Sequence, residues 1–326
     1  MNIKRFILIY QLSFLLVLLS FFACKKKEQL SSINAIPSPV SQIIRKSYWP
    51  GNNSGFICGG NKNEFGFIYK TIDNGITWQN VFSNTKCIYD ILKINDTLYY
   101  ACGDSLLLLR SADGGNSWNK IKFNFELEHF NWTPLRHLFG NYRLLMAIGG
   151  ENYSNGNALW LEDDQLRWVW HFDTEFRTGI PFSNENYHLL GYGNSQVTKT
   201  YGYNYVPGNF KGDFITSSFK INNSTAFICG NDGGIYKTED AGKSWKTIIE
   251  KNKVAKKRMH FISIAFLPNS KGMCIDNSGI VYTTNDGDVW NTKEFSNNET
   301  PMHVAPFDAN TFCVSFKNGS LKLFQF

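Results

Sequence analysis

The chain contains the stretch Lys237-Thr-Glu-Asp240-Ala-Gly242-Lys-Ser244-Trp245. The pattern recurs in Lys70-Thr-Ile-Asp73-Asn-Gly75-Ile-Thr77-Trp78, Arg110-Ser-Ala-Asp113-Gly-Gly115-Asn-Ser117-Trp118 and the shortened Thr284-Asn-Asp286-Gly287-Asp-Val-Trp290. In a tight turn between two strands, an Asp carboxylate accepts hydrogen bonds from its own turn and Gly takes a positive φ. The Trp then returns an aromatic ring to the sheet. A turn repeated along the chain indicates a fold made of repeated units.

The spacing of the aspartates gives the length of one unit. Asp73 and Asp113 are 40 residues apart, Asp240 and Asp286 are 46 apart, and the 127 residues from Asp113 to Asp240 are close to three periods. A weaker copy, Leu161-Glu-Asp163-Asp-Gln165-Leu-Arg167-Trp168, lies in that interval. Short runs rich in β-branched and aromatic residues, separated by Asn, Asp, Ser and Gly, indicate four strands per unit.

The repeat resembles the Asp-box, or bacterial neuraminidase repeat, Ser/Thr-x-Asp-x-Gly-x-Thr/Ser-Trp, which lies on the blades of β-propellers. Together with the spacing, this resemblance predicts an all-β chain whose residues 40–326 form a seven-bladed β-propeller. A six- or eight-bladed ring is the alternative, and it would require a different interpretation of residues 170–212, where the repeat is weakest. The last unit has only three strands, so we expect an N-terminal strand between Ser31 and Val40 to close the last blade. We expect the following turn residues to be structural: Asp73, Gly75, Trp78, Asp113, Gly115, Trp118, Asp163, Trp168, Asp240, Gly242, Trp245, Asp286, Gly287 and Trp290.

The N-terminus resembles a lipoprotein leader of the Bacteroidetes type. Lys4 and Arg5 precede an apolar run that ends at Ala23-Cys24. We therefore predict a signal peptide over residues 1–23, a lipidated Cys24 and a flexible tether over residues 24–39. These features would hold the protein on the bacterial cell envelope, with the outer membrane as the expected site; an uncleaved transmembrane anchor is the alternative. We also expect a monomer.

The charge and the cysteines exclude several classes of function. A formal charge of +6 spread along 326 residues does not indicate nucleic-acid binding. Cys58, Cys102 and Cys229 each precede a Gly, and Cys274 and Cys313 occupy related places. This repetition predicts buried free thiols in place of disulfides. Without a Cys-x-x-Cys or Cys/His cluster, we expect no metal and no cofactor.

The propeller resemblance implies that ligands use the face opposite the repeated turns and the mouth of the central channel. One candidate surface is the long loop from Asn124 to Thr133, where aromatic residues with neighbouring carboxylates suit sugar stacking. Its binding candidates are Phe125 and Trp132, with Tyr153 from another long loop. A glycosidase would need a pair of carboxylates on this face, and the weak catalytic candidates for that pair are Glu126, Glu128, Asp173 and Glu175. The alternative is that these aromatic residues only cover the blades.

A second candidate surface is basic. Lys256, Lys257 and Arg258 run into Met259-His260-Phe261, which resembles Met302-His303-Val304 and Arg136-His137-Leu138 at the starts of other inner strands. Arg136, His137, His260 and His303 would then line the channel mouth and attract an anionic group. The alternative is that the lysine-rich loop is only a solvated turn.

Sialidases with this repeat carry an early Phe/Tyr-Arg-Ile-Pro motif, whereas here Phe176-Arg177-Thr-Gly-Ile180-Pro181 is interrupted and lies in mid-chain. The stretch from Cys229 to Trp245 resembles more closely the repeat of the photosystem II stability/assembly factor branch. That resemblance implies a non-enzymatic propeller that docks a protein or glycan. The alternative is a glycoside hydrolase or carbohydrate-binding protein of the Asp-box type.

Overall fold

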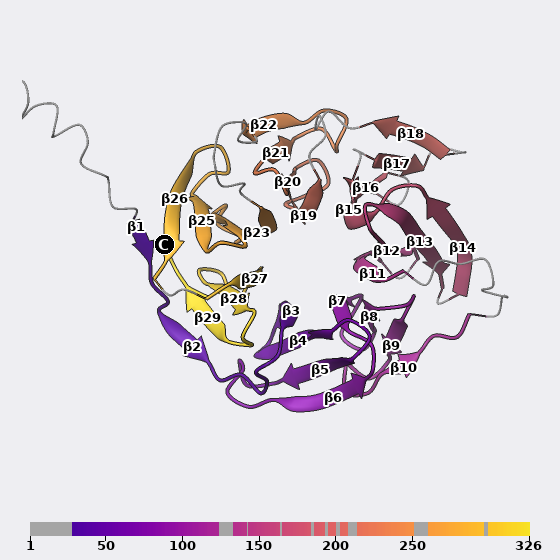
Figure 1. The fold of residues 1–326 in the computed structure, drawn as a ribbon, viewed down its shortest axis with the longest axis horizontal. Coiled ribbons are helices and arrows are strands. Elements are labelled where there is room, and N and C mark those ends of the chain that lie inside the picture. Colours follow the sequence, from indigo (N-terminus) through magenta and orange to yellow (C-terminus); the bar gives the residue numbers. More distant parts are fainter. Residues whose placement is uncertain are drawn as a thin grey trace, which may run out of the picture.

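The computed structural model describes residues 28–326 except 124–132, 142, 164, 184–185, 193–194, 200–202, 208–213, 251–259 and 297–298. Strands β1 to β29 form sheets arranged around a central opening, with one edge strand of most sheets nearest the opening (Figure 1). The chain is therefore an all-β propeller. The part of the chain that the structure describes contains no helix that could cross a bilayer.

Most sheets are antiparallel meanders in chain order. The first is β3 (Ile44–Gly51), β4 (Ser54–Asn61), β5 (Phe65–Thr71) and β6 (Gln79–Asn84). The second is β7 (Ile88–Lys93), β8 (Tyr99–Gly103), β9 (Leu108–Ser111) and β10 (Asn119–Lys120). The third is β11 (Leu135–Gly140), β12 (Leu145–Glu151), β13 (Ser154–Glu162) and β14 (Gln165–Phe172). A later one is β19 (Ile215–Lys220), β20 (Ala226–Gly230), β21 (Ile235–Thr238) and β22 (Lys246–Ile249).

The region between β14 and β19 is paired differently. β15 (Phe176–Pro181) pairs with β16 (Tyr187–Gly191), and β17 (Ser195–Lys199) pairs with β18 (Tyr203–Pro207) as a separate two-stranded sheet. The described strands thus form six sheets of four or five strands and two of two strands. Strand pairing alone does not establish the predicted count of seven blades, because no hydrogen-bonded ladder joins β16 to β17 among the described residues.

The N-terminal segment completes the last two sheets. β2 (Asn34–Ile36) pairs with β29 (Leu321–Phe324), beside β28 (Phe312–Phe316) and β27 (Pro301–Pro306). The closing strand therefore lies in the predicted interval Ser31–Val40. β1 (Glu28–Leu30) adds a parallel fifth strand to β23 (Phe261–Phe266), β24 (Gly272–Asp276), β25 (Ile280–Thr284) and β26 (Trp290–Phe295).

The tether predicted over residues 24–39 is wrong for Glu28–Ile36. Leu30 is 5% exposed and packs in a core cluster with Phe295 and Phe324, while Glu28 forms an ion pair with Lys293 at 2.8 Å. The polar composition that suggested a tether belongs to an edge strand, which needs only one buried side chain and backbone hydrogen bonds to stay in place.

The repeated turns share one hydrogen-bond network. In the first turn, Gly75 N–H donates to Thr71 Oγ1 at 2.9 Å, and Thr77 donates to Asp73 from its backbone N–H at 2.9 Å and its hydroxyl at 2.6 Å. The turns of Asp113 and Asp240 repeat these bonds. Hydrogen bonds from Thr77 and Thr71 lower the pKa of Asp73 to about 2, so its carboxylate is an ionised acceptor within the turn.

The turn glycines also bring neighbouring sheets into contact. Gly115 has a φ of +84°, and a Cβ there would meet the Phe56 ring of the preceding sheet at 2.5 Å. Gly242 has a φ of +83°, and a Cβ there would meet His188 at 2.1 Å. Each glycine is therefore required both by its own turn and by the adjacent sheet.

The six described cysteines are buried free thiols. Cys58, Cys102 and Cys229 share one register position, opposite Lys46, Asp90 and Ser217. Cys274 and Cys313 were expected at related places and lie near this register position but not at it. Cys274 lies opposite Ile264, one residue further along its inner strand, and Cys313 lies opposite Ala305, two residues further along.

Candidate functional site

The inner strands share a β-bulge next to their first residue. The register shifts at the second residue of β3, β7, β11, β15, β19, β23 and β27. A bulge leaves one residue out of the ladder and re-aims its side chain. The residues at this position are Arg45, Tyr89, Arg136, Arg177, Thr216, Ile262 and Met302, and all of them line a central cavity of about 540 Å³.

Four consecutive inner strands place Arg45, Tyr89, Arg136 and Arg177 at this position; we call these residues the arginine arc. The Arg136 guanidinium lies 4.7 Å from the centre of the Tyr89 ring, and that of Arg45 lies 5.9 Å from it. Tyr89 donates its hydroxyl proton to the buried Asp104 at 2.9 Å, so its orientation is fixed. The arc is thus a continuous cationic row with an aromatic ring within it.

Glu175 positions two of the arginines. Its side chain is 1% exposed and lies 2.5 Å from Arg177 and 3.7 Å from Arg136 Nε. Two guanidinium groups therefore share one buried carboxylate. Burial and the nearby Arg136 lower the pKa of Arg177 to about 10, and an additional anion would offset the repulsion between the two guanidinium groups.

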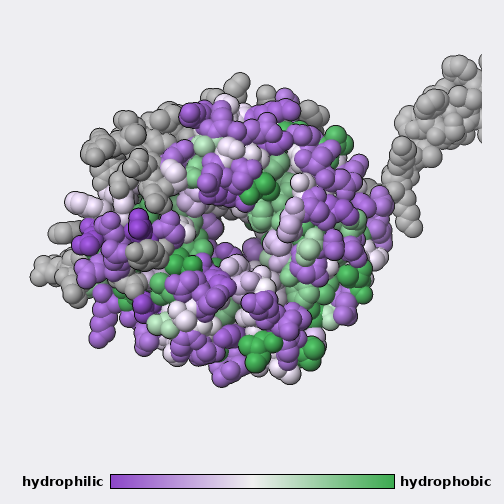
Figure 2. Space-filling model, turned by 180° about the vertical axis from the view of Figure 1, so that it is seen from behind, coloured by the Kyte–Doolittle hydropathy of each residue, from purple (hydrophilic) through white to green (hydrophobic). Residues whose placement is uncertain are grey.

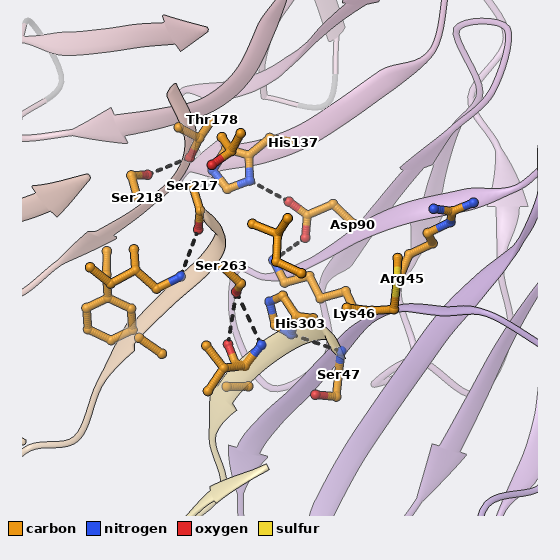
Figure 3. Close-up of a pocket in the computed structure, with 18 of the residues that line it drawn as sticks. Arg45, Lys46, Ser47, Asp90, His137, Thr178, Ser217, Ser218, Ser263 and His303 are labelled. Atoms are coloured by element: carbon orange, nitrogen blue, oxygen red, sulfur yellow. Dashed lines mark hydrogen bonds and ion pairs between the residues drawn. The ribbon is translucent and has the colours of Figure 1, made fainter. Parts of the chain in front are cut away.

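Arg45 has no carboxylate partner among residues 28–326 as described. Its Nε atom is buried without a hydrogen-bond partner, and Figure 3 shows the side chain extending away from Asp90. A planar guanidinium without a carboxylate partner suits an external carboxylate, which it can bind through two parallel hydrogen bonds. The arc therefore has capacity for an external anion at this end.

The third residue of each inner strand forms a second row in the lining of the cavity. Most of these side chains bond to the next strand around the ring. Ser217 Oγ accepts from Ile264 N–H at 3.3 Å, Ser263 Oγ from Val304 N–H at 3.2 Å, and His303 Nδ1 from Ser47 N–H at 3.5 Å (Figure 3). We interpret this row as a structural ring of inter-strand hydrogen bonds.

Asp90 is the charged centre of that row. Lys46 Nζ contacts one carboxylate oxygen, and His137 Nδ1 lies 2.8 Å from the other, which also accepts from Leu138 N–H at 2.9 Å. Burial raises the pKa of Asp90, but Lys46 and His137 outweigh burial and hold that pKa well below its usual range. This carboxylate is saturated, which leaves the arc as the part of the cavity with cationic groups available.

The structure places the predicted site residues in several different surroundings. Arg136, His137 and His303 line the cavity, Arg136 in the arc and the two histidines in the second row. His260 does not share their position: it lies three residues before Ser263, the equivalent of His303, and bonds to Asn231 at 2.9 Å. The prediction failed there because it matched Met-His pairs without the bulge that sets the register. Phe125, Glu126, Glu128, Trp132, Lys256, Lys257 and Arg258 lie outside the described residues.

The remaining candidates have different surroundings. Asp173 is exposed in a turn, whereas Glu175 is buried and bound by arginines, so it positions those side chains. Tyr153 is 55% exposed at the rim. Arg45, Tyr89 and Arg177 were missed, although aligning Ile44-Arg45-Lys46 and Phe176-Arg177-Thr178 with Leu135-Arg136-His137 would have found the two arginines.

Figure 2 shows that the ring is pierced at its centre and that both hydrophilic and hydrophobic residues border the opening on the side drawn there. Among the described residues, no group of three or more His, Cys, Asp or Glu side chains could hold a metal ion. The chemistry that the cavity does offer is anion binding by guanidinium groups, beside hydroxyl-bearing walls.

No protein-family model and no curated protein matches the sequence. Solved structures do match in fold. "YCF48 bound to D1 peptide" matches with a TM-score of 0.67 and 15% identity, over 92% of this chain and all of that one. YCF48 from Cyanidioschyzon merolae matches with a TM-score of 0.65 and 14% sequence identity, over 90% of this chain and 98% of that one. The WD40 β-propeller domain of Doa1 matches with a TM-score of 0.68 and 10% sequence identity, over 92% of this chain and 97% of that one. These similarities establish the propeller fold.

Proposed function

We propose that this protein is a non-enzymatic docking propeller, anchored to the cell envelope by lipid, which binds an acidic segment of a partner polypeptide on its arginine arc. The observation that carries the proposal is the recurrence of Arg45, Arg136 and Arg177 at one bulge position of neighbouring inner strands. All three arginines line one cavity, where Arg136 and Arg177 share the carboxylate of Glu175 and Arg45 has no described carboxylate partner. Arginine is well suited to binding an acidic side chain, because the planar guanidinium group presents N–H donors that can bind both oxygens of a carboxylate.

The solved structure of YCF48 bound to D1 peptide supports a polypeptide as the partner, since it is a propeller of similar fold with a peptide bound. By analogy, we assign this chain to an assembly-factor-like branch of Asp-box propellers. The half-exposed Tyr153 ring keeps a carbohydrate ligand as the second candidate, because aromatic faces stack on sugars.

We further propose seven blades, with β15 to β18 forming a single blade. In support, β16 and β17 lie in contact, and β15 follows β11 and precedes β19 around the opening (Figure 1). The leader-like residues 1–23 and the Cys that follows them support lipidation at Cys24 and a place on the outer membrane. Incorporation of a labelled fatty acid into the expressed chain, abolished by Cys24→Ser, would test this part.

Arg45→Gln is the sharpest test of the docking site. Because Arg45 has no described carboxylate partner, its removal leaves no buried charge unpaired. Residues 25–326 should bind fluorescein-labelled Gly/Ser peptides with a Glu-Glu pair more tightly than Gln-Gln peptides, and added salt should weaken the binding. Arg45→Gln should reduce the affinity for the acidic peptide about tenfold or more.

The matched control is Arg143→Gln, an exposed arginine beyond the end of β11, on the opposite face. This variant should bind like the native chain. Equal binding of the Glu-Glu and Gln-Gln peptides, or equal losses in the two variants, would contradict the proposal. Displacement of the peptide by an uncharged oligosaccharide would instead favour the carbohydrate candidate.

A further inference from the structure

Three aromatic rings meet beside the arginine arc. Tyr153 lies in the β12–β13 loop, Tyr192 directly follows β16, and Phe214 directly precedes β19. The ring of Tyr153 lies 5.3 Å from that of Tyr192 and 5.5 Å from that of Phe214, and the last two are 6.0 Å apart. We call these residues the aromatic trio.

The trio is held at the surface. Tyr153 and Tyr192 are 55% and 47% exposed, although most other large apolar rings of the described chain are in the core. Asn152 and Tyr153 have φ values of +60° and +63°, which is unfavourable for a bulky side chain. The two positive φ values belong to the two-residue turn that joins β12 and β13, and this turn presents the Tyr153 ring to solvent.

Glu175 connects the trio to the arc. Its carboxylate accepts the Tyr153 N–H at 2.9 Å, and its backbone oxygen accepts the Tyr192 N–H at the same distance. The same carboxylate holds Arg136 and Arg177. The Arg177 guanidinium in turn lies 5.4 Å from the centre of the Phe214 ring. One buried residue therefore fixes two tyrosines and two arginines relative to one another.

We infer that the arc and the trio form a single bipartite site, which takes a polypeptide segment carrying an acidic residue close to a large apolar one. This inference rests on the proposed function and specifies its ligand. The carboxylate binds the arc, and the apolar side chain packs on the trio. The two parts meet within 5.4 Å, and an extended chain advances about 3.4 Å per residue, so the two ligand residues are about one to three positions apart.

The test uses four short fluorescein-labelled Gly/Ser peptides and residues 25–326. The first peptide carries a Glu-Glu pair with Trp two residues before it, and the second has Ser in place of that Trp. The third carries the same Glu-Glu pair but has its Trp at the far end of the peptide. The fourth keeps the nearby Trp and has Gln-Gln in place of Glu-Glu. We expect the first peptide to bind about tenfold more tightly than the second and the third. The fourth should bind weakly.

The double variant Tyr153→Ser/Tyr192→Ser should abolish the preference for the nearby Trp. Val289→Ser, which alters a 65% exposed apolar residue in a repeated turn, is the matched control and should keep the preference. Circular dichroism and thermal unfolding verify that the variants fold.

The outcomes separate this inference from the proposed function. If Arg45→Gln weakens all Glu-Glu peptides but the preference for Trp survives in the double variant, the docking function stands and the bipartite site is wrong. The same conclusion follows if Trp acts equally well at the far end. If no Glu-Glu peptide binds, the docking function itself is wrong. Displacement of the peptides by a uronic acid oligosaccharide at similar concentration would overturn the assignment to polypeptides.

Discussion

Gly115 carries two constraints that act on a single Cβ position. Its φ of +84° disfavours any L side chain, and the Phe56 ring occupies the space that a methyl group would take. Gly51 provides a matched comparison, because its φ is +91° but no atom lies within 4 Å of its Cβ position.

We therefore expect Gly115→Ala to lower the free energy of unfolding by about 2 kcal/mol or more, and Gly51→Ala by about 1 kcal/mol. Urea unfolding of both variants measures the difference. Equal losses would mean that the contact with Phe56 adds nothing to the strain of the turn.

His303 makes the stability depend on pH. Burial, with a further contribution from Lys46, lowers its pKa to about 3, and its Nδ1 accepts the Ser47 N–H. The unfolded chain binds the proton near pH 6.5, whereas the folded chain does not until about pH 3. This contribution to stability is therefore present above pH 6.5 and is lost as the pH falls toward 3. The groups facing His303 are Lys46, Asp90 and His137.

His303→Gln should remove this pH dependence. Between about pH 7.5 and about pH 5, we expect the native chain to lose on the order of 1 kcal/mol more stability than the variant. Urea titrations at both pH values provide the measurement. The same slope in both proteins would show that His303 is protonated in the folded chain or contributes little.

At the scale of the element, the sequence predicts those features whose cause is local. A turn in which Asp, Gly and Ser or Thr satisfy one another can be recognised from one stretch, as at Asp240. The arc could not be recognised in this way. Arg45 and Arg136 come together only through the register of two strands far apart in the sequence, and the bulge that aims them leaves no residue signature of its own.

The motif lysines illustrate a further non-local effect. Lys70 bonds to Gly114 O at 2.9 Å and to Asn116 at 2.8 Å in the next turn, and Lys237 lies 3.2 Å from Asp288 in the next turn. Each of these repeats thus contains a local turn and also a lysine that contacts the turn of the next repeat. One unit alone cannot form that contact, which explains why the pattern indicates a ring only when several copies are compared.

The N-terminal strap, Glu28–Ile36, offers an internal control for the closure of the ring. Leu30 is 5% exposed, and Ile33 is 56% exposed in the same segment. We expect Leu30→Ala to lower the free energy of unfolding by about 2 kcal/mol, because its side chain leaves a cavity beside Phe295 and Phe324. Ile33→Ala should change it by less than about 0.5 kcal/mol. Equal effects in chemical unfolding would mean that β1 is not docked on β26 in solution.

At the scale of the whole molecule, the ring is closed by contacts of unequal strength. The sheet of β19 to β22 has three ladders, whereas β15–β16 and β17–β18 are joined within each pair only, among the residues described. An isolated two-stranded sheet is marginally stable in water, so the sector β15 to β18 depends on its neighbours. The repeat is also faintest there in the sequence, which is why the blade count could not be fixed from residues alone.

This asymmetry predicts where the ring opens first. Amide hydrogen exchange reports the free energy of local opening, and ladders with fewer neighbouring strands open at lower free energy. In hydrogen-exchange mass spectrometry of residues 25–326, we expect peptides covering β17 and β18 to exchange faster than those covering β20 and β21. The β29 peptide, held by β2 on one side and β28 on the other, should match β20 and β21. Fast exchange of β29 together with slow exchange of β17 would locate the weak point at the N-terminal closure, and the sector β15 to β18 would then be as firmly joined as any other blade.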